Sequence, residues 1–153
     1  MWRGAKVIEH GILRAKQALP AYARIQCMCA DLLCLLKEFK PPIVVIEVMI
    51  ERQHTRKNER TTSLAVCATA MGAMWGVAMV ACAEWSGQVA PVSNTTWTRG
   101  SSKADRAIRA KILCPEYDAE KDKGFDRADA ITLGDYFRQR QIKAALGIAG
   151  HAP

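Results

Sequence analysis

The run Pro-Pro-Ile-Val-Val-Ile-Glu-Val-Met-Ile-Glu at residues 41–51 decides the fold of this chain. Residues 43–50 are apolar, rich in β-branched side chains and as long as a strand, and they lie between a proline pair and a charged segment. Such a run is typical of an inner strand of a parallel sheet that is covered on both faces. Glu47 interrupts it, and a carboxylate at that depth needs a cation or a position at the strand's end. A nearby arginine would by itself satisfy Glu47.

Composition and charge limit the classes of protein to consider. The 153 residues are 50% hydrophobic and 24% charged, which indicates one globular domain with a real core. The net charge of +7 favours a polyanionic partner, nucleic acid before membrane. The six cysteines mostly lie in apolar stretches, and no secretory signal is recognisable, so we expect reduced thiols in a cytoplasmic protein.

Residues 64–83 form an uncharged stretch about as long as a membrane-spanning helix. The stretch consists mostly of Ala, Val, Met, Gly, Cys and Thr, with a single leucine, so its hydrophobicity is shallow. We therefore expect no membrane partner. A buried helix, packed closely on a sheet or against a copy of itself, explains the composition better.

Periodicity and helix-breaking residues predict the remaining elements. We expect one or two short strands within 6–14, a helix at 20–40, the strand at 43–50, a helix within 64–83, a strand at 88–92, and helices at 103–113 and from 126 to about 146. On the helix at 103–113, we expect Arg106, Arg109 and Lys111 to be exposed and Ala107, Ile108 and Ile112 to face inward. The order predicts an α/β domain over residues 1–146, followed by a flexible tail at 147–153.

Asp126 and Asp129 lie three residues apart at the start of the last predicted helix, so both project from one face of its first turn. A cap or a dipole partner explains one of them, but two are harder to explain in this way. If Glu47 lies near this helix start, three carboxylates converge, and two such charges ~4 Å apart repel by roughly 4 kcal/mol. Cations must then neutralise the cluster. Oxygen ligands favour Mg²⁺ or Mn²⁺, and pairs of these ions catalyse phosphodiester hydrolysis.

Two groups of basic residues accompany the acidic ones. They are Arg52, Arg56, Lys57 and Arg60 after the central strand, and Arg99, Lys103 and Arg106 further along the chain. Each residue singly is explained as solvated surface. As groups, they suit phosphate contacts that position DNA without reading its bases.

Four segments of the chain follow one another in an order and at spacings that occur in a known protein family. They are Ile43-Val-Val-Ile-Glu47, Lys57-Asn58, the helix with Gly72, and Asp126-Arg-Ala-Asp129-Ala130. Together, over about residues 6–137, they resemble the RuvC Holliday-junction resolvases of the RNase H-like superfamily, in particular the short phage-type members.

The resemblance implies an RNase H-like fold, with a mixed sheet flanked by helices on both faces. It makes Glu47, Asp126 and Asp129 the catalytic residues, which bind two Mg²⁺ ions that Mn²⁺ can replace. The implied activity is endonucleolytic cleavage of branched DNA, above all Holliday junctions. The implied protein is a homodimer, with the uncharged helix as its seam, in the cytoplasm of a bacterial cell or a phage-infected host.

Two features depart from the family's pattern. The family's first strand, which ends in a metal-binding aspartate, has no counterpart here, because residues 1–14 resemble its second and third strands. We expect such a strand to be encoded upstream of Met1; the alternative is a truncated protein. If the strand is encoded upstream, we expect weak Mg²⁺ binding and poor or no cleavage by the chain as printed. A family lysine is also replaced by Thr98, and Arg99 or Lys103 would supply its charge.

Three alternatives to a resolvase stay open. The chain could be a non-catalytic or impaired protein that binds branched DNA, because the first metal-binding aspartate is absent. It could be a small membrane protein. It could also be a less selective nuclease that acts on branched DNA or on RNA–DNA hybrids.

Overall fold

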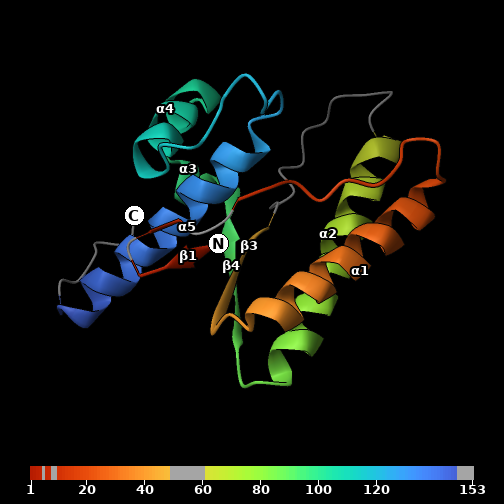
Figure 1. Cartoon of the computed structure of the whole chain (residues 1–153), viewed down its shortest axis with the longest axis horizontal. Coiled ribbons are helices and arrows are strands. Elements are labelled where there is room, and N and C mark those ends of the chain that lie inside the picture. Colours follow the sequence, from red (N-terminus) through yellow and green to blue (C-terminus); the bar gives the residue numbers. More distant parts are fainter. Residues whose placement is uncertain (5, 8–9, 49–60, 148–153) are drawn as a thin grey trace. The chain divides into compact units, whose positions relative to one another are not determined.

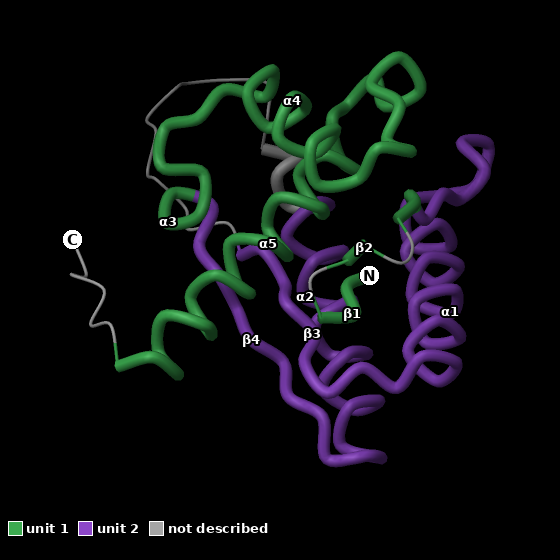
Figure 2. Tube along the Cα trace, turned by 60° about the vertical axis from the view of Figure 1, so that its left-hand side comes forward, with its two compact units in different colours: residues 1–12, 95–153 green, residues 13–94 purple. Residues whose placement is uncertain are grey.

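The computed structural model describes residues 1–4, 6–7, 10–48 and 61–147. In chain order its elements are β1 (Trp2–Arg3), β2 (Lys6–Val7), α1 (Ala21–Phe39), β3 (Ile43–Val48), α2 (Thr61–Ala83), β4 (Gln88–Ser93), α3 (Asn94–Thr98), α4 (Lys103–Leu113) and α5 (Asp126–Ala145) (Figure 1). They form two compact units, coloured in Figure 2. We call Leu13–Asn94 the sheet unit, and Met1–Ile12 with Thr95–Pro153 the terminal unit.

The sheet unit is built on β3 and β4, which pair in parallel. Parallel pairing requires a long crossover, which α2 provides. Because side chains alternate along a strand, Val44 and Ile46 point to one face of the sheet, where they pack with Leu36 of α1 and with α2. Glu47 therefore points to the opposite face, beside its register partner Val92. The predicted parallel strand is confirmed over 43–48, and residues 49–50 lie outside the described residues.

Helices α1 and α2 lie side by side and pack against each other as well as on the sheet (Figure 1). Helix α1 ends at Lys40, which adopts a left-handed conformation and donates its N–H to the Leu36 carbonyl. The turn from α2 to β4 then comes close to the start of β3. The Trp85 Nε1–H donates to the Pro41 carbonyl at 3.0 Å, and a Cβ at residue 87 would clash with both groups, so this turn requires glycine.

The exposed face of α2 is apolar. Val66–Ala83 has a mean hydropathy of 1.8, and only 17% of this segment is buried within the chain. Met79 and Val80 are exposed, and added Cβ atoms at Gly72 and Gly76 would meet nothing within 4 Å. By length and composition alone, α2 could cross a membrane. The prediction that this helix packs on a sheet is confirmed, but the expectation that it is buried is wrong for the single chain.

The terminal unit has its core where α4 packs on α5. Its buried residues are Ala107, Ala110, Cys114, Tyr117, Ala128 and Ile131, and Trp2, Val7, Leu113 and Phe125 pack against them. Strands β1 and β2 form a short antiparallel pair, with Trp2 opposite Val7. Within the described part of 6–14, only Lys6 and Val7 are in a strand, and α3 was not predicted from the polar sequence at 93–102.

The predicted bounds of α4 are confirmed, but the expected orientation of several side chains is wrong. Arg106 is only 9% exposed, whereas Ile108 and Ile112 are 63% and 76% exposed. The small side chains of Ala107 and Ala110 let α4 approach α5 closely, and this turns Arg106 inward and both isoleucines outward. Arg106 tolerates burial because it meets a carboxylate of α5.

Candidate metal and DNA site

Glu47 lies near the carboxyl end of β3, where its neighbour is an amide. Asn94 directly follows β4, and its Nδ2 donates to the Glu47 Oε1 at 2.5 Å. The parallel register, with Glu47 opposite Val92, places these two residues at the same edge of the sheet. An amide donor orients a carboxylate without neutralising its charge. Among the described residues, no arginine pairs with Glu47, and the arginines of the segment that follows β3 lie outside these residues.

Asp126 and Asp129 occupy the first turn of α5, as their spacing predicted. Asp126 is exposed, and its side chain forms no hydrogen bond or ion pair with another described residue. Asp129 is about a quarter exposed at its side chain and is paired with an arginine of α4. Asp135, six residues further along α5, is buried between Arg109 and Arg138. Burial alone would raise the pKa of Asp135, but hydrogen bonds from both arginines lower it.

Arg106 holds Asp129 from α4. Its Nε donates to the Asp129 Oδ1 at 2.5 Å, and its Nη2 lies 3.5 Å from Oδ2. The remaining donor, Nη1, reaches the Ser101 carbonyl at 2.6 Å. The guanidinium also lies over the ring of Trp97, 5.3 Å from its centroid. Arg106 therefore supplies positive charge at one of the predicted metal ligands.

This geometry bears on three of the residues that were predicted to contact DNA. Arg106 was expected at the surface, but its guanidinium is buried and committed to Asp129 and Ser101, so its assignment to DNA binding gains no support. Arg99 is exposed beside the Tyr136 ring, and the Lys103 ammonium donates to the Gly124 carbonyl. DNA binding by these two residues stays a prediction.

The other predicted phosphate contacts belong to the segment that follows Glu47. They are Arg52, Arg56, Lys57 and Arg60. All four lie outside the described residues, so their role also stays a prediction.

Sequence reasoning missed a buried network in front of α5. Asp122 is fully buried and accepts the Tyr117 hydroxyl and the backbone N–H groups of Arg127 and Ala128. Burial, reinforced by the hydrogen bond to Asp122, raises the pKa of Tyr117 to about 12. The available signal was an aspartate four residues before the predicted start of the helix, close enough in sequence to accept its first N–H groups.

The three predicted ligands are chemically suited to a hard divalent cation. Glu47, Asp126 and Asp129 offer only carboxylate oxygens, which Mg²⁺ and Mn²⁺ prefer. When bound, such an ion activates water and stabilises the leaving oxygen in phosphodiester hydrolysis. Within the described part of the chain, no group of three His, Cys, Asp or Glu side chains could hold a metal ion. Glu47 belongs to the sheet unit and both aspartates to the terminal unit, and their convergence stays a prediction.

Comparison with known proteins identifies the fold. No protein-family model matches the chain, and no curated protein matches its sequence. Thermus thermophilus RuvC in complex with a Holliday junction substrate matches the structure with a TM-score of 0.61 and 20% identity, over 94% of this chain and 82% of RuvC. The chain has a RuvC-like fold. A second T. thermophilus RuvC structure matches with a TM-score of 0.59 and 19% identity, over 94% of this chain and 81% of RuvC. The predicted RNase H-like α/β class is confirmed, with a small sheet flanked by helices; the described strands form one parallel pair and one antiparallel pair rather than a single mixed sheet.

Proposed function

We propose that the chain is a metal-dependent endonuclease that cleaves branched DNA, with Holliday junctions as its main substrate. The observation that carries the proposal is the fold match to RuvC bound to a Holliday junction, over 94% of the chain. The net charge of +7 suits a polyanionic substrate. Glu47 adds a carboxylate at the carboxyl end of a parallel strand, where α/β proteins place their functional groups.

In this proposal Glu47, Asp126 and Asp129 hold two Mg²⁺ ions, and Mn²⁺ can replace them. Asn94 orients Glu47 by donating to one of its oxygens, so that the other oxygen is available to a metal. The basic segment at 52–60, together with Arg99 and Lys103, contacts phosphates and positions the branched DNA. The protein works in the cytoplasm, as the phage-type resemblance implies.

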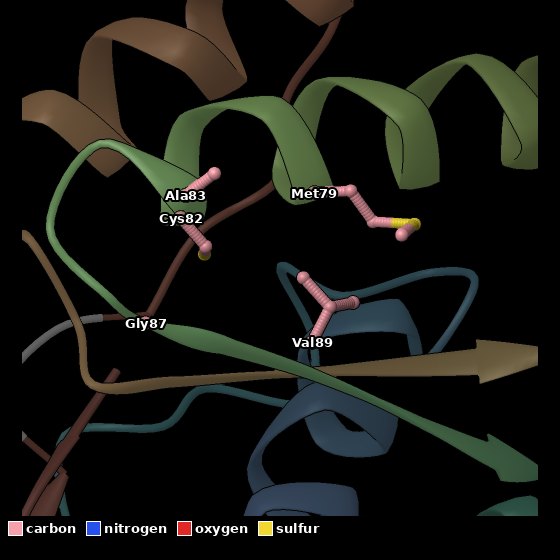
Figure 3. Close-up of a pocket in the computed structure, with 5 residues that line it drawn as sticks. All are labelled: Met79, Cys82, Ala83, Gly87 and Val89. Carbon is pink, nitrogen blue, oxygen red and sulfur yellow. The ribbon is translucent and has the colours of Figure 1, made fainter.

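We also propose that the protein acts as a homodimer through α2. The apolar face with Gly72, Gly76, Met79 and Val80 is exposed in the single chain. Beside it lies a pocket of about 150 Å³, lined by Met79, Cys82, Ala83, Gly87 and Val89 (Figure 3). Figure 3 shows Val89 of β4 pointing toward α2 at this pocket. A second copy of the chain would remove this apolar surface from water.

Cleavage of a four-way junction tests the proposal. We expect the chain as printed to cut the junction only slowly with Mg²⁺ or Mn²⁺, because it lacks a counterpart of the family's first metal-binding aspartate, and Glu47→Gln to abolish this cutting while leaving folding and junction binding intact. Glu38→Gln is the matched control, because Glu38 is exposed on α1, away from the carboxyl end of β3. Cutting by Glu47→Gln at the parental rate would show that the site is assigned wrongly.

A second candidate function is a non-catalytic protein that binds branched DNA. The ion pair between Arg106 and Asp129 favours it, because this arginine neutralises a predicted ligand without any metal. Junction binding that is unaffected by EDTA, together with an absence of cleavage at millimolar Mn²⁺, would support this candidate and contradict the nuclease.

A further inference from the structure

The first turn of α5, which carries Asp126 and Asp129, has an unusual cap. Phe125 is the residue before the helix, and it is left-handed with φ 61° and forms no side-chain hydrogen bond to the turn. The first N–H groups of a helix have no partner within the helix, and a buried turn needs acceptors for them. Asp122 provides these acceptors from outside the usual capping position.

One oxygen of Asp122 serves three donors. Its Oδ2 accepts the Arg127 N–H at 3.1 Å, the Ala128 N–H at 3.0 Å and the Tyr117 hydroxyl at 3.0 Å. Asp122 and Tyr117 are both fully buried. A carboxylate buried in this way is stabilised by every donor that reaches it, and the loss of one donor loosens its position.

Tyr117 is itself fixed from several sides. The Lys111 ammonium donates to the Tyr117 carbonyl at 2.9 Å. The Tyr117 ring lies in the core of the terminal unit together with Ala128 and Ile131. The Arg127 guanidinium lies over the same ring, 5.9 Å from its centroid. The hydroxyl therefore reaches Asp122 from a rigid support, and the turn before α5 is held against α4 rather than only by its own backbone.

We infer that Asp122 and Tyr117 are positioning residues for the metal ligands Asp126 and Asp129. Arg127 and Ala128, whose N–H groups are bound by Asp122, lie between the two ligands, so this contact fixes the rotation of the turn that presents both. The inference rests on the proposed function. A cap that served stability alone would leave the metal affinity unchanged.

Binding of Mn²⁺ alone to the full chain, measured by electron paramagnetic resonance, tests this role. We expect Asp122→Asn to lower Mn²⁺ affinity by about 10–100-fold, the range found when groups behind metal ligands are removed. Tyr117→Phe keeps the ring and the buried carboxylate but removes one donor, so it should fold normally and lower the affinity by less. In both variants, amide hydrogen exchange at Arg127 and Ala128 should speed up.

The control is Ile131→Val, which removes one methylene from the same core and the same helix without touching the cap. An equal loss of Mn²⁺ affinity in Ile131→Val would overturn the inference, since general loosening would then explain the effect. If Asp126→Asn abolishes binding but both cap variants bind as the parent does, the inference alone fails. If the parental chain does not bind Mn²⁺, the proposed function fails and this inference fails with it.

Discussion

The Arg106 guanidinium is the ion-pair partner of the Asp129 carboxylate, and both side chains are largely buried. The two residues lie on different helices, α4 and α5, and the same guanidinium covers Trp97. The pair therefore joins the core of the terminal unit to one predicted metal ligand. It also means that a metal ion at Asp129 would meet a resident cation.

Loss of this pair should be costly. We expect Arg106→Met to lower the free energy of unfolding by roughly 3 kcal/mol, because it leaves a mostly buried carboxylate without its partner. The double variant with Asp129→Asn should recover part of that loss, because the orphaned charge is gone. Urea denaturation of the four proteins in the cycle measures the coupling. A cost below about 0.5 kcal/mol would show that the pair is no stronger than an ordinary surface ion pair.

Arg106 and a divalent metal should compete for Asp129. If Asp129 is a ligand, Arg106→Met should bind Mn²⁺ more tightly than the parent, and Mg²⁺ should raise its melting temperature more. Arg109→Met is the matched control, because Arg109 lies on the same helix and pairs with Asp135, which is not a proposed ligand. Equal Mg²⁺ stabilisation of both variants would argue against Asp129 as a ligand.

The exposed face of α2 gives a direct test of self-association. Gly76 is exposed and a Cβ added there meets nothing within 4 Å, so we expect Gly76→Leu to fold normally and to act only on a partner that approaches this face. We expect the parent to be a dimer at micromolar concentration without detergent and Gly76→Leu to be largely monomeric. Ala30→Leu adds apolar bulk to an exposed position on α1 and should leave the dimer intact. Analytical ultracentrifugation distinguishes these states, and a monomeric parent would contradict the seam.

His10 should make the terminal unit less stable in mild acid. Burial lowers the pKa of His10, and the positive charges of Arg127 and the N-terminus lower it further, against the opposing effects of Glu116 and Asp122. The Arg127 Nε donates to the His10 Nδ1, so the folded protein favours the neutral ring. As the pH drops, His10 of the unfolded chain takes up a proton first, at about pH 6.5. The free energy of unfolding therefore falls as the pH drops through this value toward the lower pKa of His10 in the folded protein.

Unfolding by urea between about pH 7.5 and about pH 5.5 checks this prediction. His10→Gln cannot titrate, so its stability should fall less over this interval than that of the parent. His151→Gln, outside the described residues, serves as the control and should behave as the parent does. Parallel pH profiles for the parent and His10→Gln would mean that the Arg127 contact does not select the neutral ring.

The basic segment after Glu47 should govern the salt dependence of DNA binding. Neutralising Arg56, Lys57 and Arg60 together should weaken binding to every branched DNA. It should also flatten the log–log salt dependence by roughly one unit for each phosphate contact that is lost. Titration of a labelled junction at several salt concentrations measures this slope. An unchanged slope would mean that these three side chains are solvated surface.

The sequence by itself determined the elements whose information is local. The apolar run at 43–48 sets the central strand, Pro20 and Pro41 bracket α1, and the periodic pattern at 103–113 sets the bounds of α4. The spacing of Asp126 and Asp129 likewise required only helical geometry. These features depend on neighbours within a few residues, so pattern and propensity suffice to predict them.

Only the tertiary structure decided which charges meet. Arg106 was expected in solvent because an isolated arginine is costly to bury, but Asp129, 23 residues away, provides the charge that makes burial possible. Asn94 reaches Glu47 across 47 residues, because parallel strands bring their carboxyl ends to one edge. Asp122 becomes a cap because the Tyr117 hydroxyl and two backbone N–H groups converge on it. Such pairings join residues through space, and no spacing along the chain encodes them.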